Sequence, residues 1–219
     1  MADVYSPGGR RTRRHQETRE QIMLHAIDIM DSQGVAGLSL GEVARRLGVR
    51  TPSLYSYVDS KNALYDALFQ RGWQECHAVV RSHATRLGTI TAETDVVDRA
   101  QALLTSFVRW ALDHPALSQL MLLRPVPAWE PEALAYQAAL DVLQLQIDEV
   151  HAYQDKDLLR ADADPEEMVA NLAAICTGVI ARQLANEPRV PYDRGQAHAH
   201  FPALVTAVIQ HYLPQASHS

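Results

Sequence analysis

Prolines divide this chain unevenly, and their positions favour a helical fold. Pro52 is the only proline between Gly8 and His114, whereas prolines recur through the rest of the chain. A proline inside an α-helix removes a hydrogen bond and clashes with the preceding turn, so it marks a helix boundary. The 219 residues include only 10 glycines, which gives little sign of a turn-rich all-β chain. We therefore expect an all-α protein of one or two domains.

Apolar residues recur at helical spacing along most of the chain. In the N-terminal part, this pattern predicts helices over residues 14–33, 39–47, 51–57 and 60–86. In the remainder it predicts helices over residues 92–114, 116–123, 132–153, 165–185 and 194–212, with a proline-rich loop over 124–131. Ser39 and Glu42 form a Ser-x-x-Glu pattern that predicts a capped helix start. Thr51 is expected to cap the next helix, with Pro52 at its first helical position.

Charge is also divided unevenly between the two parts of the chain. The net charge is −6, but residues 1–71 hold 10 Lys and Arg against 8 Asp and Glu. Five of these cations lie within the first twenty residues: Arg10, Arg11, Arg13, Arg14 and Arg19. A basic N-terminal part on an acidic body suggests one face for a polyanion, although a solvated basic tail gives the same asymmetry.

Several classes of protein are disfavoured. No run of 18 apolar residues predicts a membrane span, and no apolar stretch follows the N-terminal arginines to form a secretory signal. Cys76 and Cys176 lie far apart without a CxxC motif, which fits a reducing cytoplasm and no zinc ribbon. His198 and His200 fall on different sides of a helix, so we expect no metal site and no cofactor. No GxSxG, P-loop or HExxH motif is present, so we expect no enzyme.

The helices predicted over 39–47 and 51–57 have the spacing of a helix-turn-helix, with the turn at residues 48–50. In this motif one helix packs steeply on the next and holds it as a rigid projection that fits a DNA major groove. The packing set expected here comprises Val43, Ala44, Leu47, Val49, Leu54 and Val58. A plain αα-corner inside a helical core is the alternative interpretation.

One continuous run carries a family resemblance. The segment from Gly37 to Val49, followed by Thr-Pro-Ser-Leu-Tyr-Ser-Tyr-Val (residues 51–58) and Ser-Lys-Asn-Ala-Leu (60–64), resembles the DNA-binding domain of the TetR repressor family. The resemblance covers residues 16–76, with the helix-turn-helix at 39–58. It implies an N-terminal three-helix DNA-binding domain, followed over 77–215 by a helical effector-binding and dimerisation domain. It also implies a homodimeric repressor that a small-molecule effector releases from a palindromic operator in double-stranded DNA.

The resemblance also assigns DNA-binding residues. Ser53, Tyr55, Tyr57 and Lys61 would contact phosphates, and Arg50, Thr51 and Pro52 would face base edges. Arg50 is the strongest candidate for reading a base, because a guanidinium can donate two hydrogen bonds to guanine. Gly41 stands where some relatives carry a long polar side chain that reaches a base, so that contact is missing here.

The C-terminal half offers two further sets of candidates. Apolar stripes that would form a four-helix dimer interface are Met168, Leu172, Ile175, Val179, Phe201, Leu204, Val205 and Val208. Aromatic and polar residues that could line an effector pocket are Phe107, Trp110, Met121, Trp129, Tyr136 and Gln137. Both sets could instead belong to the core of a single protomer.

The interpretation is therefore a cytoplasmic, ligand-responsive transcriptional repressor with no membrane association. Two alternatives stay open: a helical enzyme or small-molecule carrier, and a regulator controlled by a protein partner rather than a small molecule.

Overall fold

A computed structural model describes residues 7–92 and 94–214, and these residues form helices and loops with no strand. The α-helices are α1 (Pro7–Gln33), α2 (Leu40–Leu47), α3 (Thr51–Leu54), α4 (Lys61–Leu87), α5 (Val96–Asp113), α6 (Pro115–Leu123), α7 (Ala133–Gln154), α8 (Pro165–Asn186) and α9 (Gln196–Tyr212). Two short 3-10 helices lie at Val35–Gly37 and Tyr192–Arg194. The all-α prediction is confirmed.

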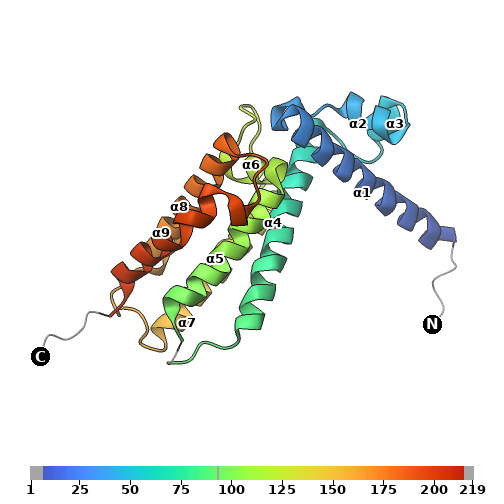
Figure 1. Ribbon diagram of the computed structural model, residues 1–219. Helices are drawn as coiled ribbons and strands as arrows, with labels where there is room; N and C mark the ends of the chain where they lie inside the picture. Colours follow the sequence, from blue (N-terminus) through green and yellow to red (C-terminus); the bar gives the residue numbers. More distant parts are fainter. Residues whose placement is uncertain (1–6, 93, 215–219) are drawn as a thin grey trace, which may run out of the picture.

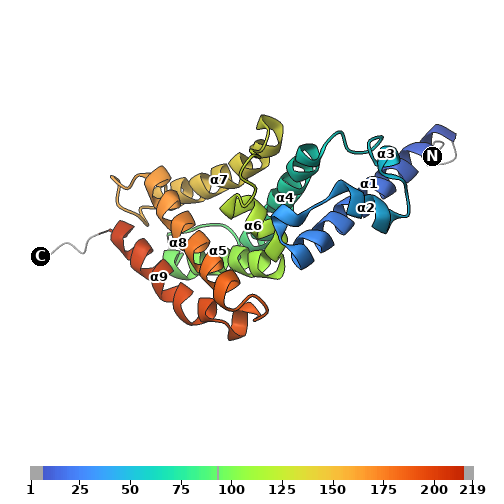
Figure 2. The same cartoon turned by 90° about the horizontal axis from the view of Figure 1, so that it is seen from above.

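The helices form two groups joined by α4. Helices α1 to α3 lie together at one end, and α4 runs from that end along the body formed by the later helices (Figure 1). Seen from above, α8 and α9 lie on the side of the molecule away from α1 to α3 (Figure 2). Within the body, α4 packs against α5, α6 and α7, and α8 packs against α9. The long helix α4 therefore belongs to both groups.

Polar contacts fix the N-terminal group on the body. The Tyr65 hydroxyl, on α4, donates to the carbonyl of Val35 at 2.7 Å. The carboxylate of Asp31, on α1, accepts a hydrogen bond from the backbone amide of Ala116 at 3.1 Å. That amide is in the first turn of α6, where backbone N–H groups have no partner within the helix. α1 is thereby tied to α6, and the 3-10 helix that follows it is tied to α4.

Most helix boundaries lie within about two residues of the sequence prediction, but several caps differ. Ser60 accepts a hydrogen bond from the amide of Ala63 and begins α4 as expected. The side chain of Ser39, however, makes no capping bond. The Glu42 carboxylate is held by Arg45 and Arg46 instead of reaching back to the Ser39 amide. Arg50 occupies the N-cap position expected for Thr51.

Three helices start or stop well away from the expected positions. α1 begins at Pro7 rather than at residue 14. α3 ends at Leu54 rather than residue 57, since the amides of Tyr57 and Val58 both donate to the Leu54 carbonyl and close a turn. α5 begins at Val96 rather than residue 92, because the Asp95 carboxylate caps the Asp98 amide.

Helix α8 is long and apolar enough to cross a membrane when judged by length and composition alone, with a mean hydropathy of 1.4. In the structure its apolar residues are used for packing: Met168, Leu172, Cys176 and Ile180 are buried. They face α5, α6, α7 and α9 of the same chain. Packing within the protein buries 39% of its apolar window and so accounts for part of the hydropathy of this helix.

Candidate nucleic-acid interface and effector cavity

A tight turn sets the angle between α2 and α3. Gly48 has φ of 74°, a left-handed conformation that favours glycine. The amide of Val49 donates to the Ala44 carbonyl at 3.0 Å, which closes the end of α2. The Val49 side chain is 37% exposed, so its predicted place in the packing set is wrong: the closed turn directs it outward.

The other members of the packing set meet as predicted. Val43, Ala44 and Leu54 are buried, and Leu47 and Val58 pack partly buried against them. Leu54 is the only buried residue of α3, so it anchors that short helix. The opposite side of α3, with Pro52 and Ser53, faces outward. α3 is therefore packed against the protein through Leu54, and its opposite face is exposed to solvent.

The predicted base-reading and phosphate-binding residues surround this free face. Arg50 immediately precedes α3 and is exposed, Thr51 is half-buried, and Tyr55 is 52% exposed. Tyr57 is less free, since its ring stacks on His15 of α1 with ring centroids 4.7 Å apart. α1 thus orients one of the phenol groups of the interface.

Lys61 lies at the start of α4, beside the same face. Its Nζ donates to the carbonyl of Ala36 at 3.3 Å and lies 5.4 Å from the centre of the Tyr65 ring. These two contacts restrict the side chain without neutralising it. Among the residues that the structure describes, no carboxylate forms an ion pair with Lys61 or Arg50. Both cations are therefore available to an anion.

By contrast, the two arginines on α2 are engaged. The Glu42 carboxylate accepts two hydrogen bonds from Arg45, both at 2.7 Å, and one from Arg46 at 3.0 Å. These bonds lower the pKa of Glu42 to about 2. Further along the basic N-terminal segment, Arg13 lies 3.8 Å from Glu17, and the side chains of Arg10 and Arg11 lie outside the described residues.

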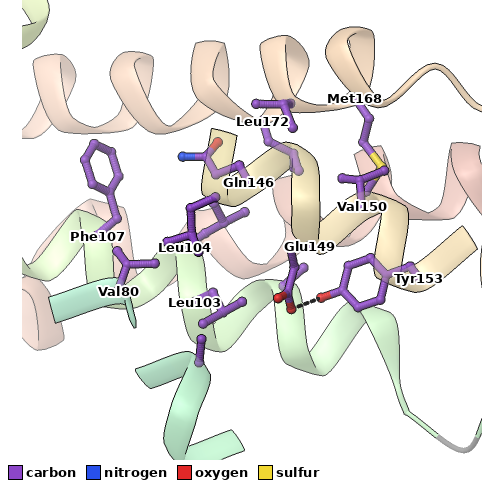
Figure 3. Close-up of a pocket in the computed structure, with 14 residues that line it drawn as sticks. Val80, Leu103, Leu104, Phe107, Gln146, Glu149, Val150, Tyr153, Met168 and Leu172 are labelled. Carbon is purple, nitrogen blue, oxygen red and sulfur yellow. Dashed lines mark hydrogen bonds between the residues drawn. The ribbon is translucent and has the colours of Figure 1, made fainter. Parts of the chain in front are cut away.

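A cavity opens within the C-terminal group of helices (Figure 3). Its enclosed interior is about 70 Å³, and the space out to its open mouth, which includes solvent, is about 650 Å³. Four helices supply its wall. The lining residues are Val80 and Ala84 on α4; Ala100, Leu103, Leu104 and Phe107 on α5; Leu145, Gln146, Glu149, Val150 and Tyr153 on α7; and Met168, Val169 and Leu172 on α8.

One side of this cavity carries a buried polar cluster. Glu149 Oε1 accepts hydrogen bonds from Arg99 Nε at 2.5 Å and from the Tyr153 hydroxyl at 3.0 Å. Arg99 Nη1 also donates to the carbonyl of Gly88 at 2.9 Å. Burial raises the pKa of Tyr153, and the neighbouring Glu149 carboxylate raises it further. The phenol therefore stays a hydrogen-bond donor.

Only Phe107, of the six residues expected at an effector pocket, lines this cavity. Trp110, Met121 and Trp129 are buried elsewhere: Trp110 stacks on His114, Met121 lies against Gly72, and Trp129 donates to Asp66 at 3.1 Å. Tyr136 stacks on Phe69, and Gln137 bonds to Asp141 at the surface.

The residues that sequence reasoning missed lie on α7. Gln146 and Glu149 share a helix face with Val150 and Tyr153, at spacings of three and four residues. An amide and a carboxylate beside buried apolar side chains are the signal that could have indicated a cavity there.

The residues expected at the dimer interface divide into two groups. Met168, Leu172, Phe201 and Val205 are buried within the protomer, and the first two line the cavity. These four side chains belong to the apolar core of the single chain. Leu204 is 41% exposed, and Ile175, Val179 and Val208 are partly exposed.

The described part of the chain contains no candidate metal site and no reactive thiol. No group of three or more His, Cys, Asp or Glu side chains there could hold a metal ion. Cys76 and Cys176 are free and buried. Burial raises the pKa of Cys176 to about 12 and raises that of Cys76 as well. Such thiols stay protonated and unreactive near neutral pH.

Comparison with known proteins covers both halves of the chain. Residues 22–68 match the family described as bacterial regulatory proteins, tetR family. Residues 100–208 match the family described as tetracyclin repressor-like, C-terminal domain. The two matches together span most of the chain. The first covers most of the N-terminal group of helices, and the second lies within the C-terminal group.

Individual relatives agree with these matches. The chain is 24% identical over 184 residues to the nucleoid occlusion factor SlmA of Haemophilus influenzae (strain PittGG), covering 80% of this chain and 79% of that protein. It is 38% identical over 50 residues to the class D tetracycline repressor protein of Escherichia coli, covering 23% of each. A regulatory protein in the tetR family from Rhodococcus RHA1 shares the fold, with a TM-score of 0.66 at 16% identity over 91% of this chain and 99% of that one.

Proposed function

The chain belongs to the TetR family of DNA-binding transcriptional regulators, which are not enzymes, and on this premise we propose that it is a cytoplasmic, homodimeric repressor. In this proposal the dimer binds a palindromic operator, and a small molecule in the cavity between α4, α5, α7 and α8 releases it. The observation that carries the proposal is the exposed outer face of α3, which is connected through α4 to an apolar cavity. This face is flanked by Arg50 and Lys61, neither of which forms an ion pair with a described residue.

Operator binding is proposed to use the two cations differently. Arg50 precedes the exposed face of α3 and can reach base edges in the major groove, where a guanidinium pairs with guanine. Thr51 and Pro52 face the bases beside it. Lys61, Ser53, Tyr55 and Tyr57 are proposed to bind phosphates, which position the protein without reading sequence.

Dimerisation is proposed to use the outward faces of α8 and α9. Ala170, Ala174 and Gly178 are exposed along α8, and Leu204 is exposed on α9. Small residues allow two helices to approach closely, and Val208 lies partly exposed beside Leu204. This surface replaces the four buried residues of the predicted interface.

Release from DNA is proposed to act through α4. Val80 and Ala84 of this helix line the cavity, and Lys61 begins the same helix at the DNA-binding end. A ligand that changes the packing of α4 against α5 and α7 therefore also changes the position of the DNA-binding groups.

Selection of binding sites from random DNA at near-physiological salt tests this function. The expected result is an enriched palindrome, with an Arg50→Ala variant relaxing the preference at one position in each half-site. Failure of the folded protein to enrich any sequence would contradict operator binding. Light scattering of the same sample checks the dimer, and Leu204→Glu is expected to produce monomers.

A further inference from the structure

The chemistry of the cavity wall restricts which molecules can enter. Nearly every lining side chain is apolar: the α5 and α8 walls consist of alanine, valine, leucine, methionine and phenylalanine. An apolar body is therefore required of the ligand, because polar groups facing this wall would lose their hydrogen bonds to water. The polar lining groups lie on α7, which supplies Gln146, Glu149 and Tyr153.

One acceptor on α7 is left open. The hydrogen bonds from Arg99 and Tyr153 both end on Oε1 of Glu149. Across the described chain, no donor is hydrogen-bonded to Oε2 of this carboxylate. Figure 3 shows Glu149 and Tyr153 together at one side of the cavity, with Phe107 well away from them. A ligand lying along this cavity can thus donate a hydrogen bond to Glu149 at one end and place its apolar part against Leu104 and Phe107.

The charge around Glu149 is already balanced. Arg99 is buried and forms an ion pair with Glu149 through Nε. A ligand carboxylate placed beside Glu149 would bring a second negative charge into an apolar site. A ligand ammonium would add an unbalanced positive charge to a pair that is neutral overall. Burying an unpaired charge is strongly unfavourable in either case.

We propose that the cavity selects an uncharged, mainly apolar molecule whose hydroxyl group donates a hydrogen bond to Glu149 Oε2. This inference rests on the effector role proposed for the cavity and names the chemical class of the effector. Gln146, which makes no hydrogen bond to another described residue, supplies a second polar contact along the same wall.

Three probes with the same alkyl chain test this selectivity on the full-length protein: octan-1-ol, octanoate and octylammonium. Isothermal titration calorimetry at pH 7.5 is expected to show octan-1-ol binding at least tenfold tighter than either ion. Octanoate binding as tightly as octan-1-ol would overturn the proposal, and so would the absence of octan-1-ol binding.

Variants locate the bound probe. Leu104→Trp fills the cavity from α5 and is expected to abolish octan-1-ol binding, while Ala84→Leu fills it more mildly from α4 and should weaken binding. Unchanged octan-1-ol affinity in both folded variants would overturn the assignment to this cavity.

Glu149→Gln tests the carboxylate itself, since it removes the negative charge beside Arg99 while preserving the shape of the side chain. Its octanoate affinity is expected to rise at least tenfold relative to octan-1-ol. Asp148→Asn is the matched control: it removes a carboxylate from the neighbouring exposed position of α7, outside the cavity lining, so the wild-type preference should persist. Retention of the full preference for octan-1-ol in folded Glu149→Gln would overturn the role of Glu149.

Fluorescence anisotropy with the selected operator separates this inference from the proposed function. Octan-1-ol that binds with the expected selectivity but leaves operator affinity unchanged would support the ligand class and contradict effector-controlled release. Specific operator binding by a protein that fails to bind octan-1-ol would leave the regulator intact and overturn the ligand class.

Discussion

The salt dependence of DNA binding gives a quantitative test of Lys61. Its Nζ is positioned by the Ala36 carbonyl and the Tyr65 ring, with no carboxylate partner in the described structure. Each phosphate contact contributes about 0.9 to the slope of log affinity against log salt, so a dimer with two copies of Lys61 should lose about 1.8 on Lys61→Ala. Raising the salt from 50 to 200 mM should therefore weaken operator binding by the Lys61→Ala variant about 12-fold less than it weakens binding by the wild type.

The assay is operator binding by fluorescence anisotropy over that salt range. Lys156→Ala is a matched control, because Lys156 is the other lysine of the chain and follows α7, away from the DNA-binding helices. The slope of this control should equal that of the wild type. A Lys61→Ala slope indistinguishable from both would refute the phosphate contact.

Four further predictions follow from the same structure. Arg50→Ala should cost about 1–3 kcal/mol of binding free energy at one operator position; an unchanged ranking of single-base operator variants would contradict base reading. Leu54→Ala should lower the free energy of unfolding by about 2–5 kcal/mol, because Leu54 is buried, and a loss below about 1 kcal/mol in urea would contradict its anchoring role. Asp31→Ala removes the acceptor for the Ala116 amide and should cost about 1 kcal/mol, whereas Asp31→Asn, which keeps an acceptor, should cost less. The pKa of Glu42 falls from 4.5 to about 2 in the folded state, so its stabilising effect should be present above pH 4.5 and disappear towards pH 2; equal acid stability of Glu42→Gln and wild type would contradict this.

Local patterns predicted the DNA-binding end well, because most of its determinants are close in sequence. Ser60 caps α4, Gly48 makes the turn, and Leu54 packs beneath α3, as the spacing indicated. The errors arise where side chains compete. Ser39 and Glu42 fit a capping pattern, but Arg45 forms the stronger charge-assisted bonds with Glu42 and draws it along the helix.

The C-terminal half was less predictable, because helical periodicity shows that a face is buried without showing what covers it. Phe201 and Val205 carry the apolar stripe of α9, and both are buried in the core of this chain, where α9 packs against α5 and α8. Gln101 of α5 reinforces this contact by donating to the Pro202 carbonyl and to Thr206. The cavity depends on how four helices pack together, and no single segment contains that information.

Because α4 is long, a small tilt of this helix at the cavity produces a large displacement at its DNA-binding end. Val80 lies nineteen residues after Lys61 on the same helix, which at 1.5 Å per residue is about 28 Å. If the cavity end stays fixed while a ligand tilts α4 by about 5°, the Lys61 end moves by about 2.5 Å. Hydrogen bonds between cations and phosphates tolerate only a few tenths of an ångström around their usual length. A tilt of this size is therefore enough to break the phosphate contacts proposed for Lys61. Because the Arg71–Glu20 ion pair ties α1 to α4, and the Tyr65–Val35 hydrogen bond ties the segment after α1 to the same helix, the rest of the DNA-binding group would move with α4 rather than stay on the operator.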